Sequence, residues 1–146
     1  MRIIASILIV LSIIFLYLLL SLSSHQLKFI DQICIIPFKD YDYKTCSSMR
    51  AIIDGKTYVI PKDFESDLAS IPRIMWPIFA PQYVGFVSPA ILHDYLYRCN
   101  DDINRKIADE VLYSALIEND VSKLTAFWFY IGVRLFGISH FNHGIC

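Results

Sequence analysis

The sequence predicts an α+β protein: an N-terminal transmembrane helix, a small antiparallel sheet with a hairpin, then an antiparallel helical hairpin plus a third helix. Three observations support this prediction. Residues 1–24 are strongly apolar, residues 27–61 are rich in β-branched and aromatic residues, and residues 88–137 carry helix start and stop signals. We therefore expect an anchor at 1–24 and a single α+β domain at 25–146.

The N-terminal segment is long enough to cross a bilayer. No charged residue occurs between Ile3 and Ser24, and a helix needs about 20 apolar residues to span the hydrocarbon core. The competing interpretation is a cleaved signal peptide, whose apolar part is usually about 7–15 residues, and Ser21 and Ser23 would suit a peptidase. The length favours a retained single-pass anchor that contacts the lipid bilayer through residues 3–24.

Charge and cysteine content bound the environment of the domain. Little chain precedes the apolar segment, which favours insertion with the N-terminus inside and a domain on the non-cytoplasmic side, although Lys28 prevents the positive-inside rule from deciding the orientation. The 4 cysteines allow disulfides in three full pairings, or reduced and buried thiols. A net charge of −1 and a pI of about 6.4 offer no basic patch, so no nucleic-acid partner is expected.

The first half of the domain is expected to form the sheet. Residues 27–36 are typical of a strand, which should end at Pro37, and a polar irregular connection should follow over 38–48. Two further strands should flank Asp54-Gly55, because both residues tolerate the positive φ angles of a tight hairpin turn.

The second half of the domain is expected to be helical. Ser70 is an N-cap signal for a short helix, and Ser88 followed by Pro89 is a start signal for a longer one. The last helix should be capped by Ser122 and ended by Gly137. The expected helices run over 71–76, 88–99, 105–119 and 123–136.

The stretch ILHDYLYR, residues 91–98, places a His and an Asp side by side in an apolar helix. At about 100° per residue, His93 and Tyr97 lie together at one edge of the apolar stripe. Asp109 and Tyr113 occupy the corresponding edge of the next helix. Because the connecting loop is short, the two helices should be antiparallel neighbours, so we expect His93 to face Asp109 with both tyrosines a turn away.

Such a pair has a chemical use. A carboxylate on one ring nitrogen of His93 fixes the tautomer and raises the basicity of the other nitrogen, which would then activate water. His93, Asp109, Tyr97 and Tyr113 are therefore the candidate catalytic residues. The alternative is a buried polar network that only fixes packing, or an Asp109 that pairs with Arg105 on its own helix.

The sequence leaves the cofactor of such a site open, and a divalent cation is a candidate. Asp94 follows His93 directly, and Asp67 lies in the preceding segment FESDLASIPR. Both carboxylates are candidate ligands for a divalent cation such as Ca²⁺. The alternative for Asp67 is local capping of the backbone.

Four segments, in this order, resemble the uncharacterised phage and bacterial family labelled domain of unknown function 1353. They are VIPKDFESDLASIPR, ILHDYLYR, NRKIADEVLYSAL and WFYIGVRLFG. The resemblance covers about residues 57–137 and implies a fold and domain boundaries. It implies no function, because no activity is established for the family. One departure is Lys62-Asp63 before Phe64, where Gly commonly precedes the Phe.

HDYLY is more loosely similar to the HDxCY signature of secreted phospholipases A2. In those enzymes the His is the base, the Asp binds calcium, and a second Asp on an antiparallel helix supports the His together with a Tyr. The likeness implies these roles for His93, Asp94, Asp109 and Tyr97. Leu96 replaces the Cys, however, and the glycine-rich calcium loop and the dense disulfide framework are missing.

Two functions follow from these observations. The first is a membrane-proximal, metal-assisted hydrolase that depends on His93 and Asp109. The second is a non-catalytic envelope or interaction protein of phage origin, in which the same motifs are structural. Solvent access at His93 separates them, because a hydrolase needs His93 in an open cleft and a structural role leaves it sealed under other side chains.

Overall fold

The computed structural model describes residues 2–39, 42–68, 84–100 and 102–141. Within these ranges the order of elements is the predicted α+β order. The helices are α1 (Arg2–Ser21), α2 (Val84–Cys99), α3 (Arg105–Glu118), α4 (Lys123–Phe136) and the 3₁₀ helix η2 (Gly137–His140). The strands are β1 (Leu27–Phe29), β2 (Ile35–Lys39), β3 (Asp42–Thr45), β4 (Met49–Ile53), β5 (Lys56–Ile60) and β6 (Glu65–Ser66).

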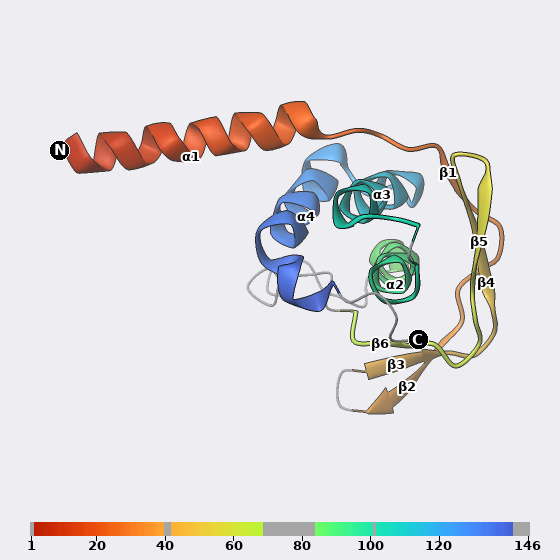
Figure 1. Cartoon of the computed structure of the whole chain (residues 1–146). Coiled ribbons are helices and arrows are strands. Elements are labelled where there is room, and N and C mark those ends of the chain that lie inside the picture. Colours follow the sequence, from red (N-terminus) through yellow and green to blue (C-terminus); the bar gives the residue numbers. More distant parts are fainter. Residues whose placement is uncertain (1, 40–41, 69–83, 101, 142–146) are drawn as a thin grey trace.

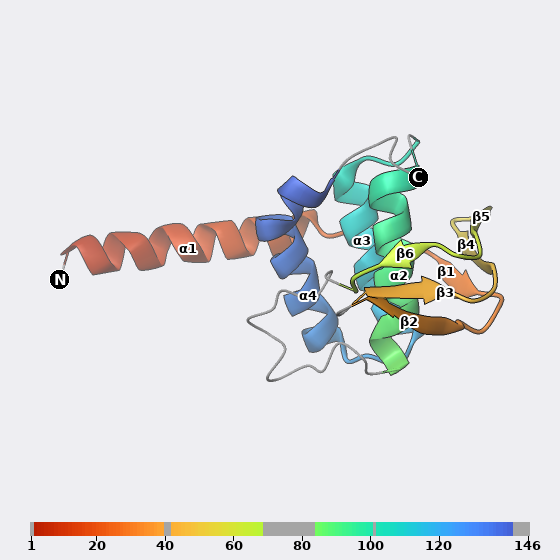
Figure 2. The ribbon, with the colours of Figure 1, turned by 90° about the horizontal axis from the view of Figure 1, so that it is seen from below.

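The domain has a helical side and a strand side. Figures 1 and 2 show α2 and α3 between α4 on one side and the hairpin of β4 and β5 on the other. In both views α1 extends away from the domain on the side of α4. The antiparallel neighbours α2 and α3 therefore lie at the centre of the domain.

Helix α1 has the length and composition expected of the anchor. Its apolar window, Ile3–Ser21, has 19 residues and a mean hydropathy of 3.1. At 1.5 Å per residue this window is about 28 Å long, close to the roughly 30 Å of a bilayer core. These two properties fit a membrane-spanning helix and a signal sequence equally.

The segment that follows α1 is tied to α3 by its backbone. The amide of Ser23 donates to Oε1 of Glu110 at 3.1 Å, and the amide of His25 donates to Oγ of Ser114 at 2.9 Å. The imidazole Nδ1 of His25 lies 2.6 Å from Oδ2 of Asp54, and this hydrogen bond lowers the pKa of Asp54. The connection between α1 and the domain is therefore held to α3 and to Asp54 by hydrogen bonds.

The strands form two antiparallel sheets, in the orders β1-β4-β5 and β2-β3-β6. The single strand predicted over 27–36 is wrong, because β1 ends at Phe29 and β2 begins at Ile35. Between them, Oδ2 of Asp31 accepts hydrogen bonds from the backbone amide and Nε of Arg50 at 2.9 and 2.8 Å. This side-chain contact replaces strand pairing and lets the chain pass from one sheet to the other.

The prediction that the strand ends at Pro37 is also wrong. β2 continues through Pro37 because it is an edge strand, with a register shift between Pro37 and Lys39, and a missing N–H is tolerated at an edge or bulge. Its partner β3 occupies part of the predicted polar connection 38–48. A disulfide joins Cys34 and Cys46, whose Cα atoms are 5.4 Å apart, and selects this pair among the open alternatives.

The predicted hairpin is confirmed. β4 and β5 pair in register from Met49–Ile60 to Ile53–Lys56, and Asp54 and Gly55 have φ angles of 48° and 82°. Two positive φ angles give the turn whose twist matches that of the paired strands. The hairpin therefore folds from local sequence and presents one face to α2.

The turn before β6 explains the departure from the family pattern. Asp63 has a φ of 64°, a left-handed conformation that Gly, Asn and Asp adopt more readily than other residues. The surrounding backbone is fixed by Thr45, whose carbonyl accepts from the Asp63 amide at 2.8 Å and whose Oγ1 accepts from the Phe64 amide at 2.9 Å. Asp63 therefore fills a glycine position.

The helices α2, α3 and α4 follow the prediction except at the start of α2. Asn104 and Ser122 cap α3 and α4, and their side chains accept from the amides of Ile107 and Thr125. α2 begins at Val84 rather than at residue 88, so Pro89 lies inside the helix. The expected short helix at 71–76 lies outside the described residues.

Pro89 is tolerated in α2 because another residue replaces its missing donor. A proline has no N–H to donate to the carbonyl four residues earlier, which here belongs to Gly85. The side-chain amide of Asn119 donates to that carbonyl at 3.3 Å. The helix therefore extends one turn beyond the start signal.

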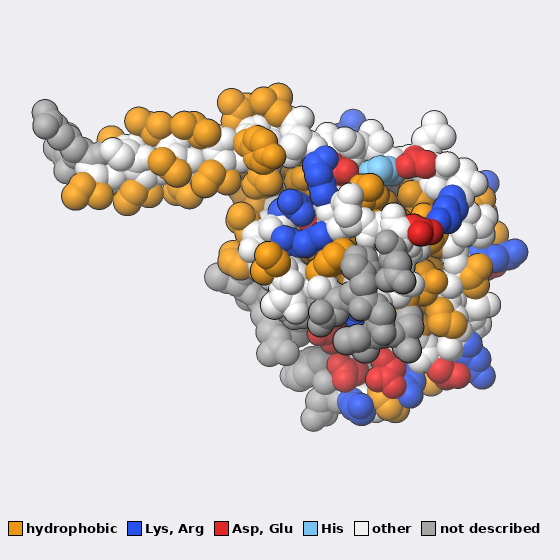
Figure 3. Space-filling view, viewed as in Figure 1, with side chains coloured by type: hydrophobic (Ala, Val, Ile, Leu, Met, Phe, Trp, Pro, Cys, Tyr) orange, Lys and Arg blue, Asp and Glu red, His pale blue; other side chains and the backbone are white. Residues whose placement is uncertain are grey.

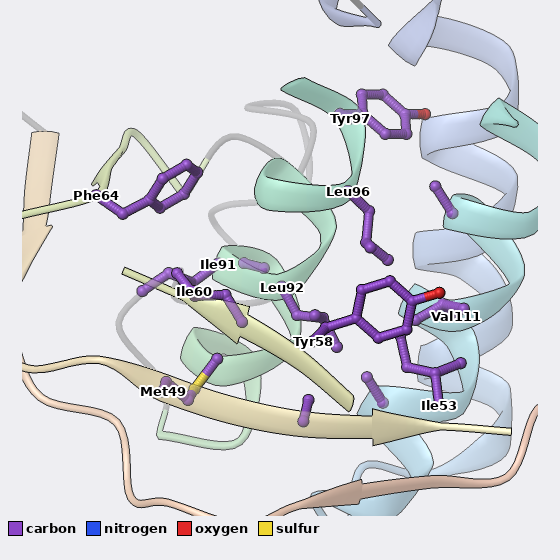
Figure 4. Close-up of a cluster of buried hydrophobic side chains, with 14 of the residues drawn as sticks. Met49, Ile53, Tyr58, Ile60, Phe64, Ile91, Leu92, Leu96, Tyr97 and Val111 are labelled. Atoms are coloured by element: carbon purple, nitrogen blue, oxygen red, sulfur yellow. The ribbon is translucent and has the colours of Figure 1, made fainter. Parts of the chain in front are cut away.

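The largest hydrophobic core lies between the hairpin and α2. Figure 4 shows Met49 and Ile60 of the hairpin meeting Ile91 and Leu92 of α2, all of them nearly inaccessible to solvent. Leu96 extends the same cluster along α2 toward the polar residues that follow. This core fixes α2, and hence the stretch ILHDYLYR, against both the sheet and α3.

Candidate functional site

The predicted contact between His93 and Asp109 is confirmed. Nε2 of His93 on α2 lies 3.0 Å from Oδ1 of Asp109 on α3. The two side chains are 3% and 0% exposed. The antiparallel arrangement of the helices brings the ring to the carboxylate, and both groups lie inside the protein.

Asp109 is the centre of a network that draws on three helices. Tyr97 of α2 donates its hydroxyl to Oδ1, and Arg134 of α4 donates Nη1 to Oδ2 at 2.9 Å. Nε of Arg105 lies 3.9 Å from Oδ2, one turn earlier on α3. Burial alone would raise the pKa of Asp109, but the hydrogen bonds from His93, Tyr97 and Arg134 outweigh it and lower that pKa. We call these residues the Asp109 network.

Tyr97 is held tightly within this network. Its ring centroid lies 4.0 Å from that of His93 and 5.0 Å from that of Phe141. A Cβ placed on Gly137 would come within 2.9 Å of its hydroxyl. Burial and the negative charge of Asp109 raise the pKa of Tyr97, so the hydroxyl stays protonated and serves as a donor.

Two arginines of this region have roles that the sequence patterns did not predict. Nη2 of Arg105 donates to the backbone carbonyls of Val133 and Arg134, at 2.7 and 2.6 Å, and so caps the end of α4. The side chain of Arg134 turns the other way, to Asp109. A signal was present, because Arg134 is the one charged residue in the apolar run 124–136 and so indicates a buried acidic partner.

Tyr113 lies one turn after Asp109 on α3 but in different surroundings. It packs against the apolar clusters that contain Leu112, Phe129 and Tyr130. It also lines a cavity together with Ser24 and other residues of the segment between α1 and β1. The structure thus brings His93, Tyr97 and Asp109 together and places Tyr113 in the apolar clusters instead.

The two candidate cation ligands, Asp94 and Asp67, line a common cavity. Its volume is about 290 Å³, and it lies where α2 meets β6 and β3. The cavity adjoins the Asp109 network, because Tyr97 lines the cavity and donates its hydroxyl to Asp109. Its lining residues are Asp42, Glu65, Ser66, Asp67, Asp94, Tyr97 and Arg98.

Asp94 is positioned within the cavity by β6. It accepts a hydrogen bond from Oγ of Ser66, and that oxygen accepts in turn from the amide of Leu68 at 3.1 Å. Burial raises the pKa of Asp94, and the nearby negative charge of Asp67 adds to the rise. A carboxyl of this kind binds a proton more readily than an exposed one.

Acidic groups outnumber basic ones around the cavity. Of the lining residues that the structure describes, four carry carboxylates and Arg98 alone is basic. Nη2 of Arg98 donates to the backbone carbonyl of Glu65, whose side chain pairs with Lys44 at 3.1 Å. Figure 3 shows acidic side chains on the lower part of the domain, with basic side chains between them. The cavity therefore presents an excess of negative charge.

A preformed metal centre is not part of this arrangement. Among the described residues, no group of three or more His, Cys, Asp and Glu side chains is placed to hold a metal ion. Calcium takes six to eight oxygen ligands, which is more than Asp67 and Asp94 supply. The chemistry that the cavity supports is attraction of a positive or hydrogen-donating group.

Comparison with known proteins identifies a family without assigning a function. The profile of a family described as "Protein of unknown function (DUF1353)" matches residues 40–133, more than half of the chain. No curated protein and no solved structure matches the chain. The match includes β3 to β6, the cavity, the helices α2 and α3, and all but the last three residues of α4.

Proposed function

The chain belongs to this DUF1353 family of proteins of unknown function, and we propose that it is a single-pass membrane protein whose domain binds a small cationic ligand. One observation carries the proposal. The adjacent residues His93 and Asp94 differ in their surroundings, because His93 is buried against Asp109 whereas Asp94 lines a carboxylate-rich cavity. The pair is thus divided between a structural and a binding role.

The Asp109 network supports a structural role for His93. An inaccessible imidazole has no path to a substrate, and the partners of Asp109 come from α2, α3 and α4. Buried polar networks of this kind fix how helices pack, because each buried donor and acceptor is costly when it is left unpaired. The network thus holds α2 in the orientation that presents Asp94 to the cavity.

The cavity at Asp94 supports binding of a positively charged organic group. Its volume of about 290 Å³ is at the lower limit of the roughly 300–1,000 Å³ typical of ligand sites, which suits an amino or guanidinium group on a short chain. The carboxylates of Asp67 and Asp94 provide the charge, and the described residues lack the oxygen cluster of a calcium site.

The anchor and the disulfide support a location at a membrane, outside the cytoplasm. The window Ile3–Ser21 is long and apolar enough to span a bilayer. The disulfide between Cys34 and Cys46 is of the kind that persists in oxidising compartments. We therefore propose that α1 remains attached and that the domain faces the exterior or the periplasm.

The test is calorimetric titration of the full chain, in detergent micelles, with agmatine and separately with Ca²⁺. We expect wild-type protein to bind agmatine, and Asp94→Asn and Asp67→Asn to weaken binding at least tenfold, because each removes a charge from the cavity. The matched control is Asp102→Asn, which removes an exposed carboxylate that pairs with Lys56 and should leave binding unchanged.

Three results of this titration contradict the proposal. If neither probe binds, the proposal of a cationic ligand is wrong. If agmatine binds equally well to Asp94→Asn and Asp67→Asn, the cavity is not the binding site. Tight binding of Ca²⁺ without binding of agmatine replaces the organic cation with a metal.

A second candidate function is hydrolysis, and the raised pKa of Asp94 favours it. A buried carboxyl with a raised pKa releases its proton less readily than an exposed one, as a general acid requires, and His93 is its neighbour in the chain. The test is release of fatty acid from anionic phospholipid vesicles, with and without Ca²⁺. Hydrolysis that both His93→Asn and Asp94→Asn abolish, in variants that remain folded, would make the enzyme the better account.

A further inference from the structure

Helix α4 exposes apolar side chains on the face turned away from the core. Phe129 and Val133 are buried in the domain, whereas Leu124, Trp128 and Leu135 are 69%, 44% and 52% exposed. At about 100° per residue, these three exposed positions lie within about 40° of one another. We call these three residues the outer α4 face. Phe136, the last residue of the helix, and Ile138 beyond it are also exposed, at 67% and 72%.

The outer α4 face adjoins the anchor. The ring of Phe15 on α1 packs against Phe127 and Trp128 of α4, with centroid distances of 5.4 and 6.2 Å. Leu18, one turn later on α1, is buried in a cluster that includes Ile131. Trp128 is therefore at once a contact of α1 and a member of the outer α4 face. Figure 3 shows hydrophobic side chains running from α1 onto the adjoining part of the domain.

The outer α4 face is also on the correct side of the domain to meet a membrane. Figures 1 and 2 place α4 on the side from which α1 extends, with β4 and β5 on the opposite side. The backbone bonds from Ser23 and His25 to α3 hold α1 close to this position. A bilayer crossed by α1 would thus lie next to α4.

The depth of the contact agrees with a position at the membrane interface. Phe15 precedes the end of α1 at Ser21 by six residues, which correspond to about 9 Å along the helix. Helices that lie on a membrane bury their apolar faces about 5–10 Å into the boundary between headgroups and acyl chains. Trp128 would therefore lie at the level where tryptophan is enriched in membrane proteins.

The charge of α4 fits the same environment. Lys123 at the start of the helix is exposed, whereas Arg134 is turned inward to Asp109, and the helix has no acidic residue between positions 123 and 136. Basic residues beside an apolar face favour anionic lipids. We infer that the outer α4 face lies at the boundary between the headgroups and acyl chains of the bilayer that α1 crosses, so that the domain contacts the membrane at two places. The inference rests on the anchor in the proposed function.

The test uses the fluorescence of Trp128 in the full chain. The chain has 2 tryptophans, so Trp76→Phe leaves Trp128 as the sole probe. The protein is reconstituted into vesicles of phosphatidylcholine and phosphatidylglycerol, with and without lipids brominated near the headgroup end of the acyl chain. We expect brominated lipids to quench Trp128 strongly and soluble acrylamide to quench it weakly.

A matched control probe lies on the opposite side of the domain. Val59 on β5 is a half-exposed apolar residue, and Val59→Trp in a chain with both native tryptophans changed to Phe reports from there. This control should be quenched by acrylamide and not by brominated lipids. Equal quenching of both probes by brominated lipids would overturn the inference, because it would show unspecific contact with lipid.

Other outcomes separate failure of the inference from failure of the anchor. If alkaline carbonate leaves the protein in the vesicles but Trp128 is quenched by acrylamide and not by lipid, the anchor stands and the second contact is wrong. If carbonate extracts the protein, the anchor and the second contact fall together. If Trp128 is shielded from both quenchers, a second copy of the chain covers the face and the inference is wrong.

Discussion

The imidazole of His93 and the carboxylate of Asp109 lie 3.0 Å apart across the interface of α2 and α3, and neither side chain is accessible to solvent. The arrangement resembles a catalytic pair in its contacts and a packing device in its burial. Tyr97 and Arg134 bond to the same carboxylate from α2 and α4. Loss of the Asp109 carboxylate should therefore destabilise the packing of all three helices.

Asp109→Asn should lower the free energy of unfolding by about 3 kcal/mol, because it removes a buried charge opposite Arg134. The pKa of Asp109 is lowered in the folded protein, so its contribution is present above the unfolded pKa of about 4 and lost as the pH falls through the folded pKa. The difference from wild type should therefore be full at pH 7 and shrink in acid. Thermal unfolding in detergent across this pH range measures it.

The control for Asp109→Asn is Asp120→Asn. Asp120 is exposed and has a φ of 61°, a conformation that Asn adopts equally well. This variant should change stability by less than about 0.5 kcal/mol. An Asp109→Asn protein that unfolds like the control would contradict a structural network.

Asp94→Asn should raise the stability of the protein at neutral pH, whereas Asp109→Asn should lower it. Burial raises the pKa of Asp94, so its contribution to stability is full below the unfolded pKa of about 4 and is lost as the pH rises through the folded pKa. At pH 7.5 the variant should unfold at a higher temperature than wild type, because it removes a carboxylate that is costly to ionise. The two proteins should converge at acidic pH.

Asp102→Asn provides the matched control for that pH dependence. Its hydrogen bond from Lys56 lowers the pKa of Asp102, so removal of this exposed carboxylate should give no gain at pH 7.5. A lower unfolding temperature for Asp94→Asn at neutral pH would show that the ionised carboxylate stabilises the fold.

Gly137→Ala should disturb Tyr97, although Gly137 has an ordinary helical conformation. An added Cβ would approach the Tyr97 hydroxyl to 2.9 Å, and this hydroxyl is held by Asp109. We expect a loss of about 1–3 kcal/mol in wild type and a clearly smaller loss in a Tyr97→Phe background, where the hydroxyl is absent. Equal losses in the two backgrounds, measured by denaturant unfolding, would rule out this contact as the cause.

The turn at Asp63 makes a separate prediction. Asp63→Gly should change stability by less than about 0.5 kcal/mol, whereas Asp63→Val should cost about 1–2 kcal/mol because a β-branched residue disfavours the left-handed conformation. The neighbouring exposed substitution Lys62→Val is the control and should be nearly neutral. Equal effects of the two Val substitutions would show that backbone conformation at Asp63 does not matter.

Local signals were sufficient for the hairpin and for the contact between His93 and Asp109. Asp54-Gly55 specifies its turn by positive φ angles. Helical periodicity and a short loop place His93 opposite Asp109, because both follow from residues close together in the chain. The family resemblance identified from short motifs is likewise confirmed.

Features that depend on distant contacts were not predictable from local patterns. β3 is polar and pairs with strands on both sides, so its composition suggested a loop. The start of α2 depends on Asn119, which supplies the donor that Pro89 lacks. Arg134 reaches Asp109 only because α4 crosses α3, and its helix periodicity does not encode that crossing.

Thermal unfolding of wild type, His93→Leu and Asp94→Asn, each with and without saturating agmatine, tests most directly the claim that these neighbouring residues have different roles. A ligand that binds only the folded protein at a hundred times its Kd adds about 2.7 kcal/mol of stability. We predict that His93→Leu lowers the free energy of unfolding by about 1–3 kcal/mol and therefore the unfolding temperature. The variant should keep the rise in unfolding temperature that agmatine causes. Asp94→Asn should unfold no lower than wild type at pH 7.5 and lose that rise. A His93→Leu protein that keeps its unfolding temperature but loses the rise would contradict the account, because it would place His93 in the binding site.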